Sequence, residues 1–356
     1  MIIAGLMSGS SLDGLDIAIC DFDWGADGQI EWQLLYHTTR ELPKVLADDL
    51  AKATTLTAKE LFKLDYEFAK FSARSMVDIL STTQLECQYI ASHGHTIYHA
   101  PSDGYSCQIG NGSTIAALSK IPTLCDFRMS DIALGGQGAP IAPIVEQYLF
   151  PEVRYFLNLG GIANISIHLE EVLAYDVCPC NQILNKIASE LGLPYDDRGL
   201  IAAQGSVCDK VLKRWNEMAY FELPPPKSID NSWVQRDFYQ AILDYQVKPK
   251  DALATMCRFI ADHIVDALIV PTKHNHNGTE LMITGGGYYN DHLIKLISDG
   301  LPQSIKIKKV SNDIVNMKEA ILMALMGYLR ISNRPNNLPS VTGAHGLTCG
   351  GGLYLP

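Results

Sequence analysis

The sequence has little that would mark a secreted or membrane-bound protein. Its first residues, M-I-I-A-G-L-M-S-G-S-S, contain neither the basic segment nor the unbroken apolar segment of a signal peptide. No apolar run approaches the roughly 18 residues that a membrane-spanning helix needs. We therefore expect a cytoplasmic protein that has no membrane partner.

The chain also lacks the cysteine spacing of a disulfide framework or a metal site. It has nine cysteines, an odd number, and only Cys178 and Cys180 lie close together. A structural zinc site needs four ligands, and His274 and His276 are far along the chain. A thioredoxin-type site needs C-x-x-C rather than C-x-C. Packed thiols are therefore favoured over a metal or redox site.

Positive charge is in deficit as well. The formal net charge is −11, which argues against a broad surface for nucleic acid. A local anion-binding pocket is still compatible with this negative net charge, because backbone N–H groups can hold a phosphate without basic side chains. The lysine-bearing pattern G-x-x-x-x-G-K-[ST] is absent, which excludes a Walker-type nucleotide site.

What the chain does contain is an alternation of strands, glycine turns and helices over 356 residues, with 47% hydrophobic residues. A strand, a glycine-rich turn and a second strand occur near residues 2–22 and again near 155–169. We also expect strands at 85–91, 172–175 and 281–283, and helical segments at 43–83, 145–149, 181–191, 252–270, 291–298 and 317–329. This pattern predicts an α/β protein with two halves that face each other across a cleft, as in sugar kinases, actin and heat-shock ATPases.

Several short segments have the composition of binding sites. G-L-M-S-G-S-S-L-D-G-L-D offers backbone N–H groups and hydroxyls to an anion, and Asp13 or Asp16 could hold Mg²⁺ directly or through water. N-L-G-G-I-A-N and T-G-G-G-Y-Y-N are two further strand-to-glycine turns that suit a nucleotide between two lobes. Each of the three segments is equally compatible with a tight turn and solvated side chains.

Two more segments have open interpretations. S-H-G-H-T-I-Y-H places His95 and His99 four residues apart, a metal-like spacing in a helix, but its glycine and the preceding strand favour turn hydrogen bonds or contact with a sugar. The guanidinium of Arg128, in D-F-R, suits a carboxylate or a phosphate. An ion pair of Arg128 with Asp126 or Asp131 across the two domains is nearly as good an explanation.

Together these motifs resemble those of the anhydro-N-acetylmuramic acid kinase family, in the superfamily of hexokinase, actin and Hsp70. The matching segments run in order from residue 5 to residue 344: G-L-M-S-G-S-S-L-D-G-L-D, S-H-G-H-T-I-Y-H-A-P, Q-I-G-N, D-F-R-M-S-D-I-A-L-G-G-Q-G-A-P, L-N-L-G-G-I-A-N-I, P-P-K-S, T-G-G-G-Y-Y-N, K-E-A-I-L and N-L-P-S-V-T-G-A. The resemblance implies a two-domain actin-like ATPase with ribonuclease H-like lobes and an active-site cleft between the domains. We expect one lobe at 1–147, joined by 314–356, and a nucleotide-binding lobe at 148–313.

The resemblance also implies an activity in cell-wall recycling. Such enzymes use ATP and Mg²⁺ to open the ring of 1,6-anhydro-N-acetylmuramic acid with water and to phosphorylate O6, giving N-acetylmuramic acid 6-phosphate. Asp176 matches the aspartate that activates the water, and His93, Thr96, Arg128 and Glu319 match positions at the sugar. The implied ATP-binding residues are Gly9, Ser10, Ser11, Leu12, Asp13, Gly14, Leu15, Asp16, Gly160, Gly161, Gly285, Gly286 and Gly287, and Asp13 is also the implied Mg²⁺ ligand. A homodimer is expected by analogy.

The chain departs from the family pattern at three places. The family's D-T-G-P-G-N is D-V-C-P-C-N at 176–181, its S-H-G-Q-T has His95 in place of glutamine, and I-D-N-S replaces T-G-R-E after P-P-K-S. Two cysteine side chains in place of glycines could narrow the site. Two alternatives therefore stay open, a kinase for another amino sugar and a binding protein of the same fold with low turnover.

Overall fold

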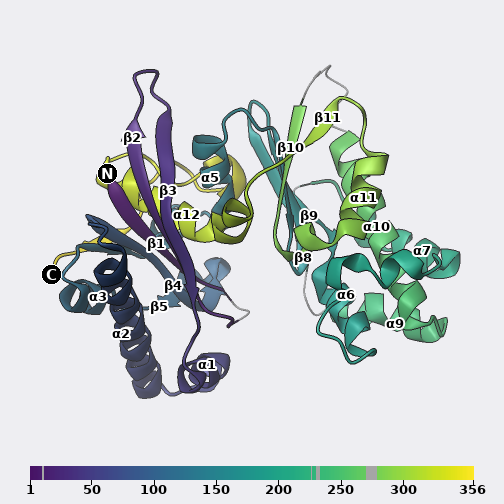
Figure 1. Cartoon of the computed structure of the whole chain (residues 1–356), viewed down its shortest axis with the longest axis horizontal. Helices are drawn as coiled ribbons and strands as arrows, with labels where there is room; N and C mark the ends of the chain where they lie inside the picture. The colour runs from purple at the N-terminus through teal and green to yellow at the C-terminus, as the bar shows by residue number, and fades with distance from the viewer. Residues whose placement is uncertain (10–11, 226, 230–232, 270–278) are drawn as a thin grey trace. The chain divides into compact units, whose positions relative to one another are not determined.

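The computed structural model describes residues 1–9, 12–225, 227–229, 233–269 and 279–356. The chain divides into two compact units, one formed by residues 1–151 with 317–356 and the other by residues 152–316 (Figure 1). The chain passes from the first unit to the second after Pro151. It returns within α12 (Asn312–Ile331), so the first unit is assembled from both ends of the chain.

The first unit is built on a seven-stranded sheet. Its strands are β1 (Ile2–Ser8), β2 (Leu15–Trp24), β3 (Ile30–Arg40), β4 (Tyr89–Ala100), β5 (Tyr105–Ile109), β6 (Thr123–Cys125) and β12 (Gly352–Tyr354). The order is β12-β6-β4-β1-β2-β3, and β5 pairs with β4. β2 runs antiparallel to β1 and β3, whereas β1, β4 and β6 are parallel.

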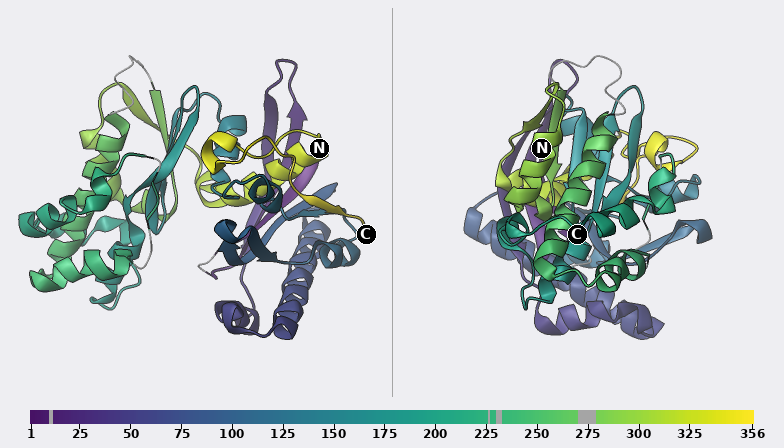
Figure 2. Two further views of the ribbon diagram at one scale, coloured as in Figure 1. Left: turned by 180° about the vertical axis from the view of Figure 1, so that it is seen from behind. Right: turned by 90° about the vertical axis from the view of Figure 1, so that its right-hand side faces the viewer.

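Helices cover both faces of this sheet. α2 (Ala58–Thr83), which begins with a capping box at Thr57, covers one face (Figure 2). Its Phe68 and Met76 belong to the same buried cluster as Leu6 and Ile17 of the strands. α12 lies on the opposite face, where a Cβ atom on Gly5 would overlap the backbone of the helix. The other helices of the unit are α1 (Lys44–Ala51), α3 (Gly112–Ser119), α4 (Met129–Ala133), α5 (Ala142–Leu149) and α13 (Pro339–Thr342).

The second unit has a five-stranded sheet of β7 (Tyr155–Leu159), β8 (Ile162–His168), β9 (Val172–Pro179), β10 (Thr279–Thr284) and β11 (Ile305–Lys308). Its order is β11-β10-β7-β8-β9. The helices are α6 (Asn181–Ser189), α7 (Asp209–Asn216), α9 (Tyr239–Asp244), α10 (Pro249–Ile269) and α11 (Asp291–Gly300). In its core Trp215 stacks on Phe238, and Phe259 meets both rings edge-on.

The two sheets share one topology. In each unit the first three strands form an antiparallel meander. Two later strands lie parallel to the first, β4 and β6 in the first unit and β10 and β11 in the second, which gives the order 3-2-1-4-5 once the additional strands β5 and β12 are set aside. This is the ribonuclease H-like arrangement. The prediction of an α/β protein with two actin-like lobes is therefore confirmed, and the two predicted strand–turn–strand units are the β1–β2 and β7–β8 hairpins.

Several local predictions were wrong. The strand predicted at 85–91 is β4, which starts later and continues through S-H-G-H-T-I-Y-H, so the histidines lie on a strand rather than in a turn. β3 and β11 were not anticipated from the sequence. The end of the helix predicted at 252–270 falls at a residue outside the described part of the chain. None of the described helices combines the length and apolar character that crossing a bilayer would require.

Candidate active site

The first candidate element is the turn between β1 and β2, which contains the predicted phosphate loop. Leu12 adopts a left-handed conformation with φ 58°, and its amide donates to the Gly9 carbonyl over 3.3 Å. A Cβ atom on Gly14 would lie 2.5 Å from the Thr39 side chain, so a larger residue does not fit there. Leu15 already belongs to the core. Ser10 and Ser11 lie outside the described residues.

Two carboxylates beside this turn, Asp16 and Glu319, have raised pKa values. Asp16 accepts a 2.5 Å hydrogen bond from the Thr39 hydroxyl. Its pKa is raised, mainly by desolvation and also by Asp13. The pKa of Glu319 on α12 is raised by desolvation and then by Asp16. Because the Glu319 side chain is solvent-exposed, water weakens these effects. Within the described ranges, no cluster of three His, Cys, Asp or Glu side chains could by itself hold a metal ion.

Arg128 also lowers the pKa of Glu319, and its own side chain is held from two sides. Its Nε donates to His93 Nε2 over 2.9 Å, and its Nη1 donates to the Gly138 carbonyl over 2.6 Å. Asp131 binds backbone and side-chain donors elsewhere. Among the described residues Arg128 has no recorded salt bridge, so the ion pair with Asp126 or Asp131 considered from the sequence is wrong.

The remaining residues of S-H-G-H-T have different surroundings along β4. His95 is buried and shares a 3.0 Å hydrogen bond with the Ser8 hydroxyl at the end of β1. Thr96 is exposed, and its hydroxyl accepts from Gln108 over 3.2 Å. His99 is exposed and contacts the Ser106 hydroxyl. The structure thus separates the three histidines, and a shared metal site for His95 and His99 has no geometric basis.

In the second unit, Asp176 lies near the end of β9. One carboxylate oxygen, Oδ2, accepts a 2.9 Å hydrogen bond from the Ile229 amide, while Tyr220 donates to the Asp176 backbone carbonyl over 2.6 Å. The Asp176 amide donates to the Lys227 carbonyl over 3.0 Å, so Lys227 and Ile229 lie directly beside this strand. Burial raises the pKa of Asp176, and the Ile229 N–H partly opposes this effect.

The neighbouring cysteines do not share the surroundings of Asp176. Asn164 pairs with Asp176, but the next residue of β8, Ala163, pairs with Cys178. The extra residue, Val177, forms a bulge that turns Asp176 and Cys178 to opposite faces of the sheet. Cys178 and Cys180 are 0% exposed in the core, and burial raises the pKa of the Cys180 thiol to about 12. Packed thiols, as expected from the spacing, are confirmed.

The two glycine turns of this unit lie side by side. Gly285 has φ +83°, and a Cβ atom there would lie 2.5 Å from Asn158 Oδ1. Gly287 approaches Leu159 just as closely. Asn181, at the start of α6, donates to the Leu159 carbonyl over 2.8 Å. The structure therefore places Gly160, Gly161 and Gly285–Gly287 around the N-terminus of one helix.

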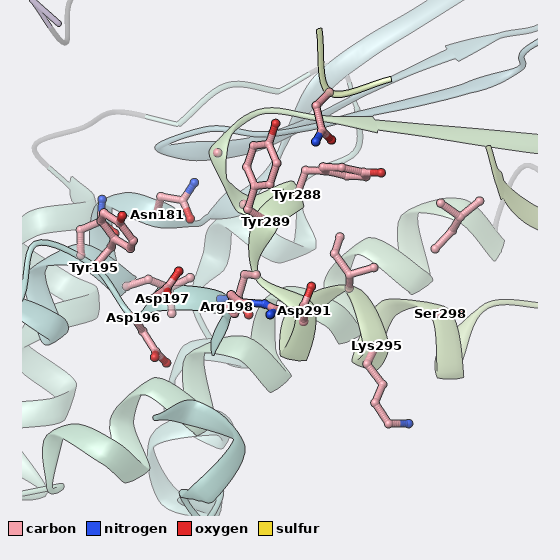
Figure 3. A pocket seen from close by; sticks show the side chains of 18 of the residues that line it. Asn181, Tyr195, Asp196, Asp197, Arg198, Tyr288, Tyr289, Asp291, Lys295 and Ser298 are labelled. Carbon is pink, nitrogen blue, oxygen red and sulfur yellow. The ribbon is translucent and has the colours of Figure 1, made fainter. Parts of the chain in front are cut away.

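A cavity of about 1050 Å³ opens beside these turns (Figure 3). Its walls come from α6, the segment 195–198, the turn 286–290 and α11. Arg198 and Asp291 face each other there in an ion pair, with 2.6 Å between Nε and Oδ2 (Figure 3). Tyr195 and Tyr289 contribute exposed rings. These residues were not predicted from the sequence, because they come from separate elements and only T-G-G-G-Y-Y-N indicated the place.

Comparison with known proteins agrees with the motifs. A family model described as anhydro-N-acetylmuramic acid kinase matches residues 1–356. Proteins named anhydro-N-acetylmuramic acid kinase from Aliivibrio fischeri and Synechococcus elongatus are 34% and 35% identical, covering 98% and 97% of both chains. Among solved structures, component A of the (R)-2-hydroxyglutaryl-CoA dehydratase of Acidaminococcus fermentans is 13% identical with a TM-score of 0.46, covering 93% of this chain and 99% of its own. The fold itself is identified by the strand order.

Proposed function

This chain belongs to the anhydro-N-acetylmuramic acid kinase family, and we propose that it uses ATP to convert 1,6-anhydro-N-acetylmuramic acid and water into N-acetylmuramic acid 6-phosphate and ADP. In this reaction a water oxygen bonds to C1 as the bond between C1 and O6 breaks. O6 then takes the γ-phosphoryl group of ATP, and the proton of the water passes to a base. The activity belongs to the recycling of the cell wall.

Asp176 is the proposed base, and its geometry is the observation that supports the mechanism most directly. Water is a poor nucleophile, so a fixed carboxylate must accept its proton as C1 is attacked. The Ile229 amide holds Oδ2, whereas Oδ1 accepts no hydrogen bond from the residues that the structure describes. Burial raises the Asp176 pKa, which makes this carboxylate a stronger base than an exposed aspartate.

ATP binding is proposed for the three glycine turns. The cavity beside Gly286 and Gly287 has the size of a small-molecule site and would take the adenosine. The turn at residues 9–16 would hold phosphate oxygens through its N–H groups. Mg²⁺ is usually bound by one or two carboxylates together with phosphates and water, and the exposed Asp13 beside this turn fits that requirement. When bound, the ion would neutralise charge on the phosphates.

The sugar is proposed to contact Arg128, Glu319 and Thr96. Arg128 keeps three N–H groups that form no hydrogen bond with any residue in the described ranges, and these suit oxygen atoms of a substrate. Glu319 can accept hydrogen bonds from sugar hydroxyls. All nine cysteines are unpaired thiols, which favours a reducing compartment, and we place the reaction in the cytoplasm.

The test is ADP release from ATP and Mg²⁺ in the presence of 1,6-anhydro-N-acetylmuramic acid, with N-acetylmuramic acid and 1,6-anhydro-N-acetylglucosamine as comparison sugars. We expect turnover with the anhydromuramic sugar and background release without it. In ¹⁸O-labelled water, the label should enter the C1 hydroxyl and not the phosphoryl group. Turnover with another sugar alone, or label in the phosphate, would contradict the proposal.

Asp176→Asn tests the base separately. We expect kcat to fall by about 10²–10⁴-fold while ATP affinity changes little. Asp209→Asn, an exposed first-turn acid of α7 in the same unit, is the matched control and should keep wild-type kinetics. Retained turnover in Asp176→Asn would exclude the assigned role.

A further inference from the structure

We propose that His93 and Asp131 are positioning residues for Arg128, and that the C-terminal tail acts on Arg128 through Asp131. This inference rests on the proposed function only in that the Arg128 guanidinium contacts the sugar. Neither His93 nor Asp131 then touches the substrate. They fix the direction in which the remaining N–H groups of Arg128 point.

His93 supplies the first support. Both of its ring nitrogens are engaged, Nε2 by Arg128 Nε at 2.9 Å and Nδ1 by the Gly94 carbonyl at 3.1 Å. Since Arg128 can only donate, Nε2 must be the acceptor, and the hydrogen-bond network assigns the proton to Nδ1. The His93 side chain is also buried, with 5% exposure. No ring nitrogen is left for a sugar, so we assign His93 to Arg128 and not to the substrate.

The neutral state of His93 is maintained by its surroundings. Burial and then the Arg128 cation lower the pKa of His93 to about 3. A protonated ring would have to donate from Nε2 toward a guanidinium that also donates, so the bond would be lost and two cations would meet. The neutral ring and the charged arginine thus support each other at neutral pH.

The second support comes from Gly138. Its carbonyl accepts from Arg128 Nη1 over 2.6 Å, while its own amide donates to Asp131 Oδ2 over 2.8 Å. Gly138 has φ +64°, and a Cβ atom there would lie 2.8 Å from Ile132 and 3.3 Å from the Arg128 side chain. Asp131 therefore fixes the residue, Gly138, whose carbonyl determines where one arm of the guanidinium lies.

Asp131 is held in turn by the tail of the chain. Its Oδ1 accepts from Asn337 Nδ2 over 2.8 Å and from the Thr342 hydroxyl over 2.7 Å. The Thr342 carbonyl also accepts from the Gln137 amide over 2.8 Å, beside Gly138. Asp131 is 3% exposed, so these charge-assisted bonds form away from water. The segment N-L-P-S-V-T-G-A, whose purpose is not evident from the sequence, thus closes a chain of contacts that ends at Arg128.

The two residues of one hydrogen bond in this chain of contacts, Asp131 and Thr342, are 211 positions apart in the sequence, yet the contacts converge on one guanidinium. A purely structural role would require only that the tail be ordered. Asn336 provides a matched control for that role, because its amide binds the Gly350 backbone at 2.6 and 2.9 Å and does not reach Asp131. Loss of Asn336 should loosen the tail without releasing Arg128.

The experiment compares KM for the sugar with KM for ATP in His93→Ala, His93→Gln, Thr342→Val, Thr342→Ser and Asn336→Ala. We expect His93→Ala to raise the sugar KM about tenfold or more, since a bond to a charged group is lost, with ATP KM within about twofold. The glutamine oxygen can accept from Arg128 Nε, so His93→Gln should recover most of the loss. Thr342→Val should raise the sugar KM, Thr342→Ser should restore it, and Asn336→Ala should lower only the melting temperature.

A spectroscopic measurement follows Arg128 without turnover. The ¹⁵N–¹H signal of Arg128 Nε, assigned by its loss in Arg128→Lys, should be sharp in the wild type. It should broaden or shift in His93→Ala and Thr342→Val, and should persist in Asn336→Ala. An unchanged Nε signal and sugar KM in His93→Ala would overturn the proposal, as would an equal rise of both KM values. If the wild type fails to turn over the sugar, the proposed function fails, and the Nε signal still decides the positioning.

Discussion

Replacing Cys178 and Cys180 by glycine would restore the two glycines of the family pattern D-T-G-P-G-N. Both thiols are 0% exposed, and the bulge at Val177 turns Cys178 away from the Asp176 face. We therefore expect the double change to destabilise the second unit without improving catalysis. If the two cysteines narrowed the active site, the double glycine variant would instead gain in rate and lose little stability.

The expected loss can be worked out from burial. Removing a buried methylene and sulfur costs about 1.5 kcal/mol, and a new glycine inside ordered backbone adds about 0.5–1 kcal/mol. Each single change should therefore lower the free energy of unfolding by about 2 kcal/mol, and the double change by about 4 kcal/mol if the two sites are independent. Cys178→Ala and Cys180→Ala should show the smaller packing loss alone.

Urea unfolding followed by tryptophan fluorescence measures this loss, since Trp215 lies in the core that contains both thiols. Cys257→Ala, in the same core but on α10, controls for loss of a thiol elsewhere. We expect kcat/KM for the sugar to stay within about threefold, a difference of ~0.7 kcal/mol in the barrier. A rise of tenfold or more in the double glycine variant, or an unchanged urea midpoint, would refute the reasoning.

Three further predictions follow from close contacts and buried charges. Gly285→Ala should raise KM for ATP tenfold or more, because the backbone at φ +83° and the 2.5 Å approach to Asn158 leave no room for a methyl group. The affinity for the sugar, measured without ATP, should not change. Lys318→Met should cost about 3–5 kcal/mol of stability because it removes the cation that pairs with buried Glu146, and the double variant with Glu146→Leu should recover most of this loss. As the pH falls from 6.5 to about 4, the free energy of unfolding should decrease by about 3 kcal/mol less in His93→Gln than in the wild type, as measured by urea titration. The wild type loses more stability because the pKa of His93 is lowered in the folded state, so that protonation favours the unfolded chain as the pH falls from 6.5 toward 3. An equal decrease in the free energy of unfolding of both proteins would contradict this prediction.

The sequence predicted those parts of the molecule that depend on local pattern. The hairpins on either side of the glycine turns and the long helices near 252–270 and 317–329 have clear periodicity, and both are present. β3 was missed because its residues are mostly half-buried, so apolar and polar positions do not alternate sharply. The histidine segment was taken for a turn because of Gly94, but the strand tolerates this glycine, with φ +77°, against the Ile109 backbone.

In the candidate site too, local sequence pattern predicted single residues but not their surroundings. Asp176 was found from its motif, whereas the face that it occupies depends on a pairing shift between Ala163 and Asn164 that no local pattern encodes. The ion pair of Arg198 with Asp291 joins residues 93 positions apart, and sequence alone gives no reason to connect them. His93 was expected at the sugar because of the resemblance to the family. Only the three-dimensional contacts show that both of its nitrogens are already engaged.

The division of the chain into units also sets an order of assembly during synthesis. Residues 152–316 form a continuous segment, so this unit can fold as soon as it leaves the ribosome. The unit that starts at Met1 cannot, because α12 and the tail that complete its sheet and hold Asp131 are made last. Until then the sheet face around Gly5 lacks its covering helix. The part of the protein that is translated first is therefore the part that is completed last.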